Sequence, residues 1–120
     1  MSKQIMIVDD SMTMRKMVTF ALQELGYRVE QAADGEQALA WLSKHRADLV
    51  ITDLHMPVMD GIALIGALRK LAAYRTTPIL VLTTDGSDEK KQQSKAAGAT
   101  GWIIKPFISQ ELCHTLQRLL

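Results

Sequence analysis

The sequence predicts an α/β protein with a parallel sheet, and three observations lead to that prediction. Short apolar runs rich in β-branched residues alternate along the chain with stretches of helical periodicity. No linker, repeat or low-complexity tract interrupts this alternation, which is typical of βαβ units. Polar residues also follow four of the apolar runs, at the edge where open α/β sheets place their ligands. We expect five strands and five helices in one domain over residues 1–120.

The first half of the chain contains two strand signals and two helix signals. The run 5–8 is the first strand, and the helix after it ends at Gly26, which favours a left-handed cap. Residues 28–32 alternate polar and apolar side chains, as an edge strand does. Asp34 with Gln37 predicts the capped start of the second helix. The apolar face of the first helix is predicted to hold Met14, Met17, Val18, Ala21, Leu22 and Leu25.

The second half repeats the pattern three more times. A strand over about 48–52 precedes the third helix, Pro78 introduces the fourth strand, and Ser87 or Asp88 caps the fourth helix. The run 102–104 is the fifth strand, and Ser109 is expected to cap the last helix. The predicted inner faces hold Ile62, Ile65, Leu68 and Leu71 in the third helix, and Leu112, Leu116 and Leu119 in the last.

Composition excludes several classes of function. Net charge is +1, which gives no reason to expect DNA or another polyanion as a partner. No segment approaches the roughly 20 apolar residues of a membrane span, and the amino terminus lacks the long apolar stretch of a signal peptide, so we expect no membrane insertion. The single cysteine, Cys113, cannot form an internal disulfide and fits a reducing compartment. We therefore expect a cytoplasmic protein.

The residues that follow the strands predict one polar site. Asp9 and Asp10 follow the first strand and Asp53 the third, while Thr83 ends the fourth and Lys105 follows the fifth. In a parallel sheet these groups converge at one edge, where crowded carboxylates repel unless a cation joins them. Helix capping by Asp10 is the alternative, but capping needs only one acid. The arrangement predicts a site for Mg²⁺, which prefers carboxylate oxygens, together with a phosphoryl group.

Asp53 is the candidate nucleophile of this site. It precedes a loop rather than a helix, so it is not placed to cap anything nearby, and a carboxylate can form an acyl phosphate. Phosphoryl transfer needs mainly positioning and charge neutralisation. Thr83 alone would be an ordinary strand-end threonine, and Lys105 could be solvated. The Lys105-Pro106 pair nevertheless favours a turn, with a cis bond as one form, that would aim the ammonium across the rim.

The histidines do not form a zinc site. His45 and His114 lie on helical stretches without ligand spacing, and His55 follows Asp53 by two residues. We interpret His55 as a loop side chain over the pocket that affects the access of water. The methionines near the acidic motifs are assigned to packing and to no cofactor.

Four spaced motifs resemble a known family. They are Ile-Val-Asp-Asp-Ser at 7–11, Thr-Asp-Leu-His-Met-Pro-x-Met-Asp-Gly at 52–61, Leu-Thr-Thr at 82–84 and Lys-Pro-Phe at 105–107. With them the chain resembles the receiver domain of two-component response regulators, and most closely the stand-alone chemotaxis regulators of the CheY type. The resemblance covers essentially the whole chain. It implies a doubly wound, flavodoxin-like sheet with strand order 2-1-3-4-5, an order for which CheY is itself a standard example.

The resemblance also implies a role for each site residue. Asp53 is the phospho-acceptor, and Mg²⁺ is bound by the side chains of Asp10 and Asp53, by the backbone carbonyl of His55, and by Asp9 through water. Thr83 hydrogen-bonds the phosphoryl oxygens, and Lys105 forms an ion pair with them. The switch aromatic, three residues before the lysine, is Trp102 here instead of the family's usual Tyr, Phe or His. The family's enteric chemotaxis members carry Asn where His55 stands, and His55 and Asp85 would flank the hydrolytic water.

The implied function is a phosphorylation switch and not an enzyme acting on other substrates. A histidine kinase of the chemotaxis type would supply the phosphoryl group, and the signal would pass by protein contact, without DNA binding. The partner would be the flagellar motor switch protein, or the chain would serve as a phosphate sink for the kinase. These alternatives stay open from the sequence.

Two rivals from other classes are weaker. An aspartyl-nucleophile phosphatase of the haloacid dehalogenase kind would need a second acid two residues after the first, where this chain has His55. A flavodoxin-like cofactor binder would need a glycine- and hydroxyl-rich phosphate loop after the first strand, where Asp9 and Asp10 would repel phosphate.

Overall fold

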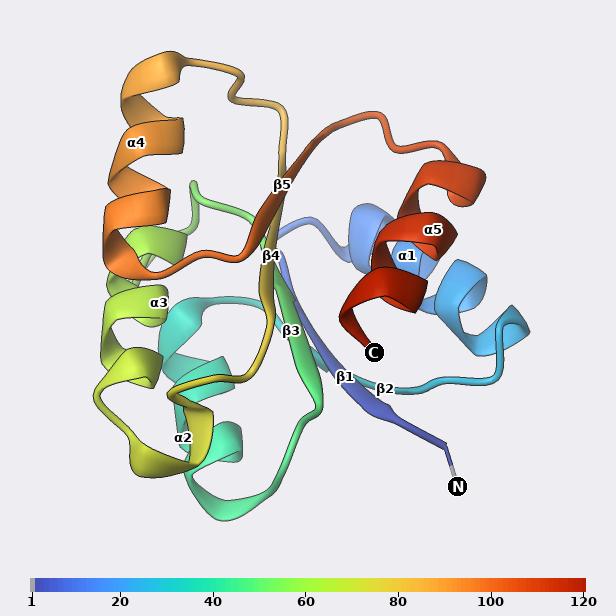
Figure 1. The fold of residues 1–120 in the computed structure, drawn as a ribbon, viewed down its shortest axis with the longest axis horizontal. Coiled ribbons are helices and arrows are strands. Elements are labelled where there is room, and N and C mark those ends of the chain that lie inside the picture. The colour runs from blue at the N-terminus through green and yellow to red at the C-terminus, as the bar shows by residue number, and fades with distance from the viewer. Residues whose placement is uncertain (1) are drawn as a thin grey trace.

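The computed structural model describes residues 2–120 as a five-stranded parallel sheet with helices on both faces (Figure 1). The strand order is β2-β1-β3-β4-β5, so the predicted doubly wound topology is confirmed, including the edge position of residues 28–32. The strands are β1 Gln4–Val8, β2 Arg28–Ala32, β3 Leu49–Thr52, β4 Ile79–Thr83 and β5 Gly101–Ile104. The helices are α1 Met12–Glu24, α2 Gly35–Lys44, α3 Gly61–Arg69, α4 Asp88–Ala97 and α5 Ser109–Leu119, with a short 3₁₀ helix, η1, at Ala72–Tyr74.

The helices divide into two layers because the buried strands are apolar on both faces. Helices α1 and α5 cover one face of the sheet, and α2, α3 and α4 cover the other (Figure 1). The strand residues alternate between the two cores: Met6 and Val8 face the α2–α4 side, while Ile5 and Ile7 face the α1–α5 side. The central strands are therefore buried along their length, as parallel strands usually are.

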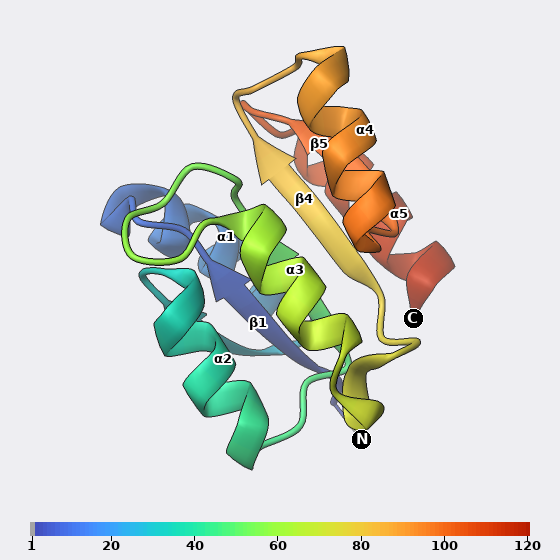
Figure 2. The same ribbon diagram turned by 90° about the vertical axis from the view of Figure 1, so that its left-hand side faces the viewer.

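Parallel register brings the carboxyl ends of the strands to one edge, which Figure 2 shows beside the loop after β3. Val8 is paired with Thr52, and Thr83 is paired with Ile104. Asp9 and Asp53, which follow the first pair, therefore lie at the same level of the sheet, and Lys105, which follows the second pair, lies further along at the same edge. The fold places the predicted site at this edge.

Most of the predicted helix starts are confirmed. The side chains of Asp34 and Ser87 accept hydrogen bonds from the backbone N–H groups of Gln37 and Lys90. Gly26 has a φ of 91°, as the left-handed cap prediction requires. Ser109 is not a cap, however, and that prediction is wrong. The residue before the helix is Ile108, which provides no side-chain cap, and Ser109 is already the first helical residue.

Two predicted helix faces need correction. In α3, Leu64 is buried beside Ile65 and Leu68, while Leu71 lies beyond the end of the helix and precedes η1. In α1, Met17 is 53% exposed, because only a narrow stripe of that helix faces the sheet. Leu25, at the C-cap of α1, is also exposed.

Within residues 2–120, no helix has the length and apolar character needed to cross a membrane.

Candidate functional site

Backbone hydrogen bonds fix the positions of three site residues, Asp9, Asp53 and Lys105. The N–H of Asp9 donates to the carbonyl of Ala32 (3.1 Å), and the N–H of Asp53 donates to that of Val8 (2.9 Å). The N–H of Lys105 donates to the carbonyl of Thr83 at 2.8 Å. Each site residue is thus held by the hydrogen-bond ladder of the sheet although it lies one step past its strand. The Lys105-Pro106 bond is cis, as the sequence had offered as one form of that turn.

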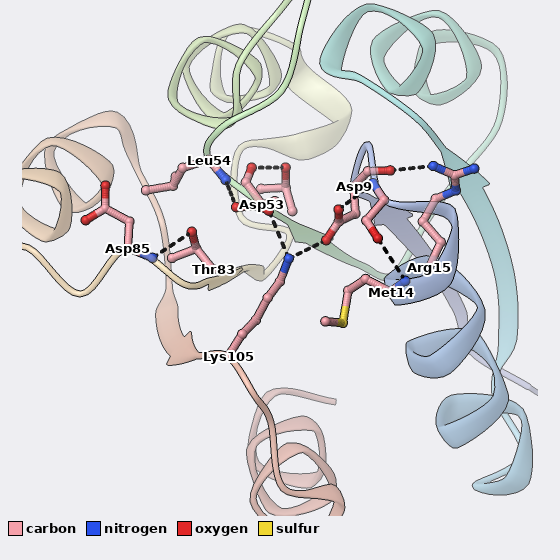
Figure 3. Close-up of polar contacts among 10 residues, drawn as sticks. Asp9, Met14, Arg15, Asp53, Leu54, Thr83, Asp85 and Lys105 are labelled. Carbon is pink, nitrogen blue, oxygen red and sulfur yellow. Dashed lines mark hydrogen bonds and ion pairs between the residues drawn. The ribbon is translucent and has the colours of Figure 1, made fainter.

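Lys105 joins two acids that are far apart in sequence. Its Nζ lies 2.6 Å from Oδ2 of Asp9 and 2.9 Å from Oδ2 of Asp53 (Figure 3). The lysine side chain is only 7% exposed. Burial alone would lower the pKa of Lys105, but the hydrogen bonds and charges of the two carboxylates raise that pKa above its ordinary value. The ammonium therefore stays charged and neutralises part of the acidic cluster.

The remaining oxygens of the two buried acids are held by backbone groups. Oδ1 of Asp53 accepts the N–H of Leu54 at 2.6 Å, and Oδ1 of Asp9 accepts the N–H of Ser11 at 2.9 Å. The carbonyl of Asp9 accepts a hydrogen bond of 2.6 Å from the guanidinium of Arg15 (Figure 3). These contacts fix the orientation of both carboxylates before any ligand arrives.

The three acids also fit a small hard cation. One carboxylate oxygen from each of Asp9, Asp10 and Asp53 lies within 4.8 Å of the others. Asp9 and Asp53 are largely shielded from solvent, whereas Asp10 is exposed at the mouth of the site. Oxygen donors from few carboxylates, with room for water on the open side, match the preferences of Mg²⁺. The predicted convergence of the three acids is present.

The loop after Asp53 approaches the site so closely that it requires a glycine. A Cβ at Gly61 would overlap the carbonyl oxygen of Asp53 and would lie 2.9 Å from Cα of Leu54. The N–H of Gly61 also donates to the carbonyl of Leu54 at 2.9 Å. Within the loop, Val58 has a φ of 70° although it is β-branched, which is a strained conformation. The loop that carries the candidate nucleophile is therefore tightly constrained.

Thr83 does not contact the Asp53 carboxylate in this structure. Its hydroxyl is buried at the end of β4 and accepts the N–H of Asp85 at 3.2 Å (Figure 3). Trp102 lies on β5, next to β4, where it is paired with Val81. Its side chain is half-buried against the core cluster on the α2–α4 side of the sheet.

His55 and Asp85 contact each other at the mouth of the site, a pairing that the sequence had not predicted. Nε2 of His55 lies 2.7 Å from Oδ2 of Asp85, which links the loop after β3 to the loop after β4. The N–H of Ser87, together with His55, lowers the pKa of Asp85 to about 2. Each partner stands two residues past a site residue on neighbouring strands. The sheet register was thus the signal that could have predicted their approach.

Comparison with known proteins places these features together in one family. The sequence profile described as "Response regulator receiver domain" matches residues 5–117. The chain is 37% identical to the chemotaxis protein CheY-3 of Vibrio cholerae over 117 residues, which covers 97% of this chain and 90% of that protein. It is 51% identical to the crystal structure of chemotaxis protein CheY4 of Vibrio cholerae, with a TM-score of 0.95 and full coverage of both chains.

A third relative bears on the acidic cluster. The receiver domain of a sensor histidine kinase from Pseudomonas aeruginosa PAO1 is 31% identical, with a TM-score of 0.93, covering 99% of this chain and 98% of that one. Its crystal structure has a magnesium ion coordinated in the active-site cleft.

Proposed function

The chain belongs to the response regulator receiver family, and from this we propose that it is a phosphorylation-activated switch that accepts a phosphoryl group on Asp53. The observation that carries the proposal is the ammonium of Lys105 held between Asp9 and Asp53. An ammonium in that position neutralises the negative charge of the carboxylates, and it would also neutralise the negative charge that a phosphoryl group adds. We take residues 1–120 to act as one receiver domain.

The transfer step follows from the chemistry of a carboxylate. A histidine kinase presents a phosphohistidine whose other ring nitrogen carries a proton, one oxygen of Asp53 forms a bond to phosphorus, and the phosphorus–nitrogen bond breaks with its electron pair left on the ring nitrogen. The product is an acyl phosphate on Asp53 and a neutral imidazole on the kinase. Lys105 pairs with the transferred oxygens, and the Thr83 hydroxyl turns from the Asp85 N–H to donate to one of them. No general base is needed, because the carboxylate is already ionised.

The acidic cluster would hold Mg²⁺ through the side chains of Asp10 and Asp53 and the backbone carbonyl of His55, with Asp9 acting through water. When bound, the ion supplies neutralisation of charge on the phosphoryl oxygens. The geometry supports this assignment because the three carboxylates lie within reach of one small cation.

We assign the output to protein contact in the cytoplasm, without DNA binding. Movement of Thr83 toward the phosphoryl group would change the space beside Trp102, and Trp102 borders the surface formed by α4 and β5. In a chemotaxis system that surface would be read by the flagellar motor switch protein. The second candidate is a phosphate sink for the kinase. A phosphatase is not favoured, because His55 occupies the position of the second acid. The chain would act catalytically only on its own phosphorylation and dephosphorylation.

Labelled phosphotransfer tests the proposal. We expect a chemotaxis histidine kinase with labelled ATP to label the wild-type chain, and expect Asp53→Asn or a Mg²⁺ chelator to abolish the label. Asp60→Asn is the matched control, since Asp60 caps α3 and asparagine caps helices equally well. Full labelling of Asp53→Asn would exclude Asp53 as the acceptor.

A second assay separates the two outputs. A motor regulator gains affinity for the flagellar motor switch protein when phosphorylated. A phosphate sink would instead shorten the phosphorylated lifetime of a second receiver that shares the kinase, without binding the motor protein.

A further inference from the structure

Most of the exposed apolar side chains lie together on one part of the molecule. Within residues 2–120, seven large apolar side chains are exposed, and five of them lie on α1, at its C-cap or just before α5. These five are Met12, Met17, Phe20, Leu25 and Ile108. Single exposed apolar residues are ordinary, but a group of them usually marks a surface that another molecule covers. This group belongs neither to the acidic site nor to the surface formed by α4 and β5.

A groove of about 350 Å³ lies between α1 and the start of α5. Both helices cover the same face of the sheet (Figure 1). Along α1 the groove is lined by Met17, Ala21 and Leu25, which are spaced four residues apart, with the small side chain of Ala21 in the middle. Phe107 and Leu112 line it from the other side. Because its lining is mostly apolar, the groove favours an apolar occupant.

A row of exposed side chains on α1 stands beside this groove. Its members are spaced four residues apart: Met12, Lys16, Phe20 and Glu24. Phe20, in the middle, is 64% exposed. In the commonest class of helix pairs, rows of this spacing on two helices pack side by side, and each row lies in a groove of the other helix. The surface of α1 therefore offers both a row and a groove for such a pair.

The charges of the row are placed symmetrically about Phe20. Lys16 lies four residues before Phe20, and Glu24 lies four residues after it. A second α1, antiparallel to the first and related to it by a two-fold axis at Phe20, would bring each Lys16 beside Glu24 of the other copy. In a two-fold interface every contact occurs twice, so two ion pairs would flank the aromatic pair. The row is thus complementary to itself in charge.

The chain itself gives these two charges no other role. Within residues 2–120, neither Lys16 nor Glu24 takes part in an ion pair. Glu24 lies in the last turn of α1, where the helix dipole favours a base over an acid. The pattern therefore suits a second copy of the helix better than it suits the helix alone.

We propose that two copies of this chain associate through antiparallel α1 helices, with Phe20 at the two-fold axis and ion pairs between Lys16 and Glu24. Phe20 of each copy then enters the groove over Ala21 of the other. A contact made mainly by one helix pair is at the low end of interface size, so the dimer is weak and reversible. The proposal goes beyond the phosphorylation switch and does not depend on it. It leaves α4 free, because α4 covers the opposite face of the sheet.

Sedimentation equilibrium over a concentration series tests the proposal. We expect the wild-type mass to rise from 13.4 kDa toward twice that value as the concentration enters the millimolar range. Phe20→Ala should weaken self-association by about tenfold or more, since an aromatic residue at the centre of an interface carries much of its binding energy. Val58→Ala is the control, because Val58 is exposed and apolar but lies outside the group on α1.

Charge reversal tests the antiparallel arrangement. Lys16→Glu alone should weaken self-association by about tenfold, because it places two acids together at both ends of the interface. Glu24→Lys alone should do the same with two bases. The double variant restores both ion pairs, so we expect its association to return to within about twofold of the wild type. Lys44→Glu, on the exposed surface of α2, is the control, and circular dichroism verifies that each variant is folded.

Several outcomes would overturn the proposal. One is a wild-type chain that stays at 13.4 kDa in the millimolar range. Another is a dimer that Phe20→Ala does not weaken, or whose double charge variant stays as weak as the single ones. A monomeric chain in which Phe20→Ala slows labelling by the kinase would assign this surface to the kinase instead of a second copy. Asp53→Asn should associate like the wild type, so failure of the phosphorylation mechanism would leave this test intact.

Discussion

At the residue scale, Lys105 both stabilises the site and competes with a metal ion for the same carboxylates. Its ammonium contacts the same carboxylates, Asp9 and Asp53, that belong to the predicted metal cluster. Because the lysine is almost fully buried, its charge is poorly screened by water. Any cation that enters the cluster must therefore bind in the field of a positive charge that is already present.

From this we predict that Lys105→Met raises the affinity for Mg²⁺ by roughly tenfold, or about 1.4 kcal/mol. The substitution keeps most of the stem and removes the competing charge. Isothermal titration calorimetry measures the affinity, and Lys44→Met, at the exposed end of α2, serves as the control. Unchanged or weaker Mg²⁺ binding in Lys105→Met would show that the lysine does not oppose the metal.

Val58, in the loop that follows Asp53, has a strained backbone conformation. Its left-handed φ of 70° costs about 1–2 kcal/mol for a residue with a Cβ, and the side chain is 75% exposed, so little packing compensates. We predict that Val58→Asn raises the free energy of unfolding by about 1 kcal/mol, because asparagine tolerates this region. Denaturant unfolding measures it. Val58→Ala, which is not β-branched but keeps a Cβ, should gain less, and a loss in Val58→Asn would contradict the strain argument.

At the scale of elements, the packing of α3 against the end of β3 sets the position of Asp53. Gly61 begins α3 where there is no room for a side chain, whereas a Cβ at Gly66, within the same helix, meets nothing within 4 Å. The two glycines thus have opposite reasons for being present. One permits a close approach to the site, and the other only weakens the helix.

We predict opposite outcomes for alanine at these two positions. Gly66→Ala should stabilise the protein by about 0.5–1 kcal/mol through helix propensity. Gly61→Ala should destabilise it by about 2 kcal/mol or more and slow phosphorylation, since the carbonyl of Asp53 must move. Thermal unfolding and the labelling rate report the two effects. Normal labelling of a folded Gly61→Ala protein would mean that this contact does not position Asp53.

The elements themselves were largely predictable because their signals are local. Capping residues such as Asp34, the left-handed Gly26 and the β-branched runs act within a few residues of their own position. Ser109 failed as a cap because a cap depends on the dihedral angles of a single residue, and the chain leaves the Pro106 turn in extended form at Ile108. The 3₁₀ turn was not expected either. It brings Tyr74 into a long-range contact, in which its hydroxyl lies within hydrogen-bond distance of the carbonyl oxygens of Leu42 (2.9 Å) and His45 (2.7 Å).

For the whole molecule, the site was predictable to the extent that parallel strands must end together. That rule alone brought Asp9, Asp53 and Lys105 to one edge of the sheet. The same register could have predicted that the loops of His55 and Asp85 lie near each other, but the bond between the two side chains depends on their rotamers. The buried polar atoms of Ser94 and Trp102 that lack hydrogen-bond partners within residues 2–120 depend on how α4 packs, which the strand rule does not predict. Sequence periodicity identifies the face of an element and does not determine such pairings.

For the whole molecule, the central claim is that phosphorylation of Asp53 is coupled to the surroundings of Trp102. A charge added at Asp53 is proposed to draw Thr83 inward and to alter the setting of Trp102, one strand further along the sheet. Indole emission depends on the polarity of its surroundings, and Trp41 would contribute a constant background. A Trp41→Phe variant therefore isolates the emission of Trp102.

The most direct test is the emission of Trp41→Phe with Mg²⁺, before and after addition of beryllofluoride as a phosphoryl mimic. Occupancy is established by ¹⁹F NMR, and Asp53→Asn in the same background is the control that should not respond. We predict a shift of the emission maximum with the mimic, beyond any quenching by Mg²⁺ alone. An emission maximum that stays in place at full occupancy, while partner affinity rises, would contradict signalling through Trp102.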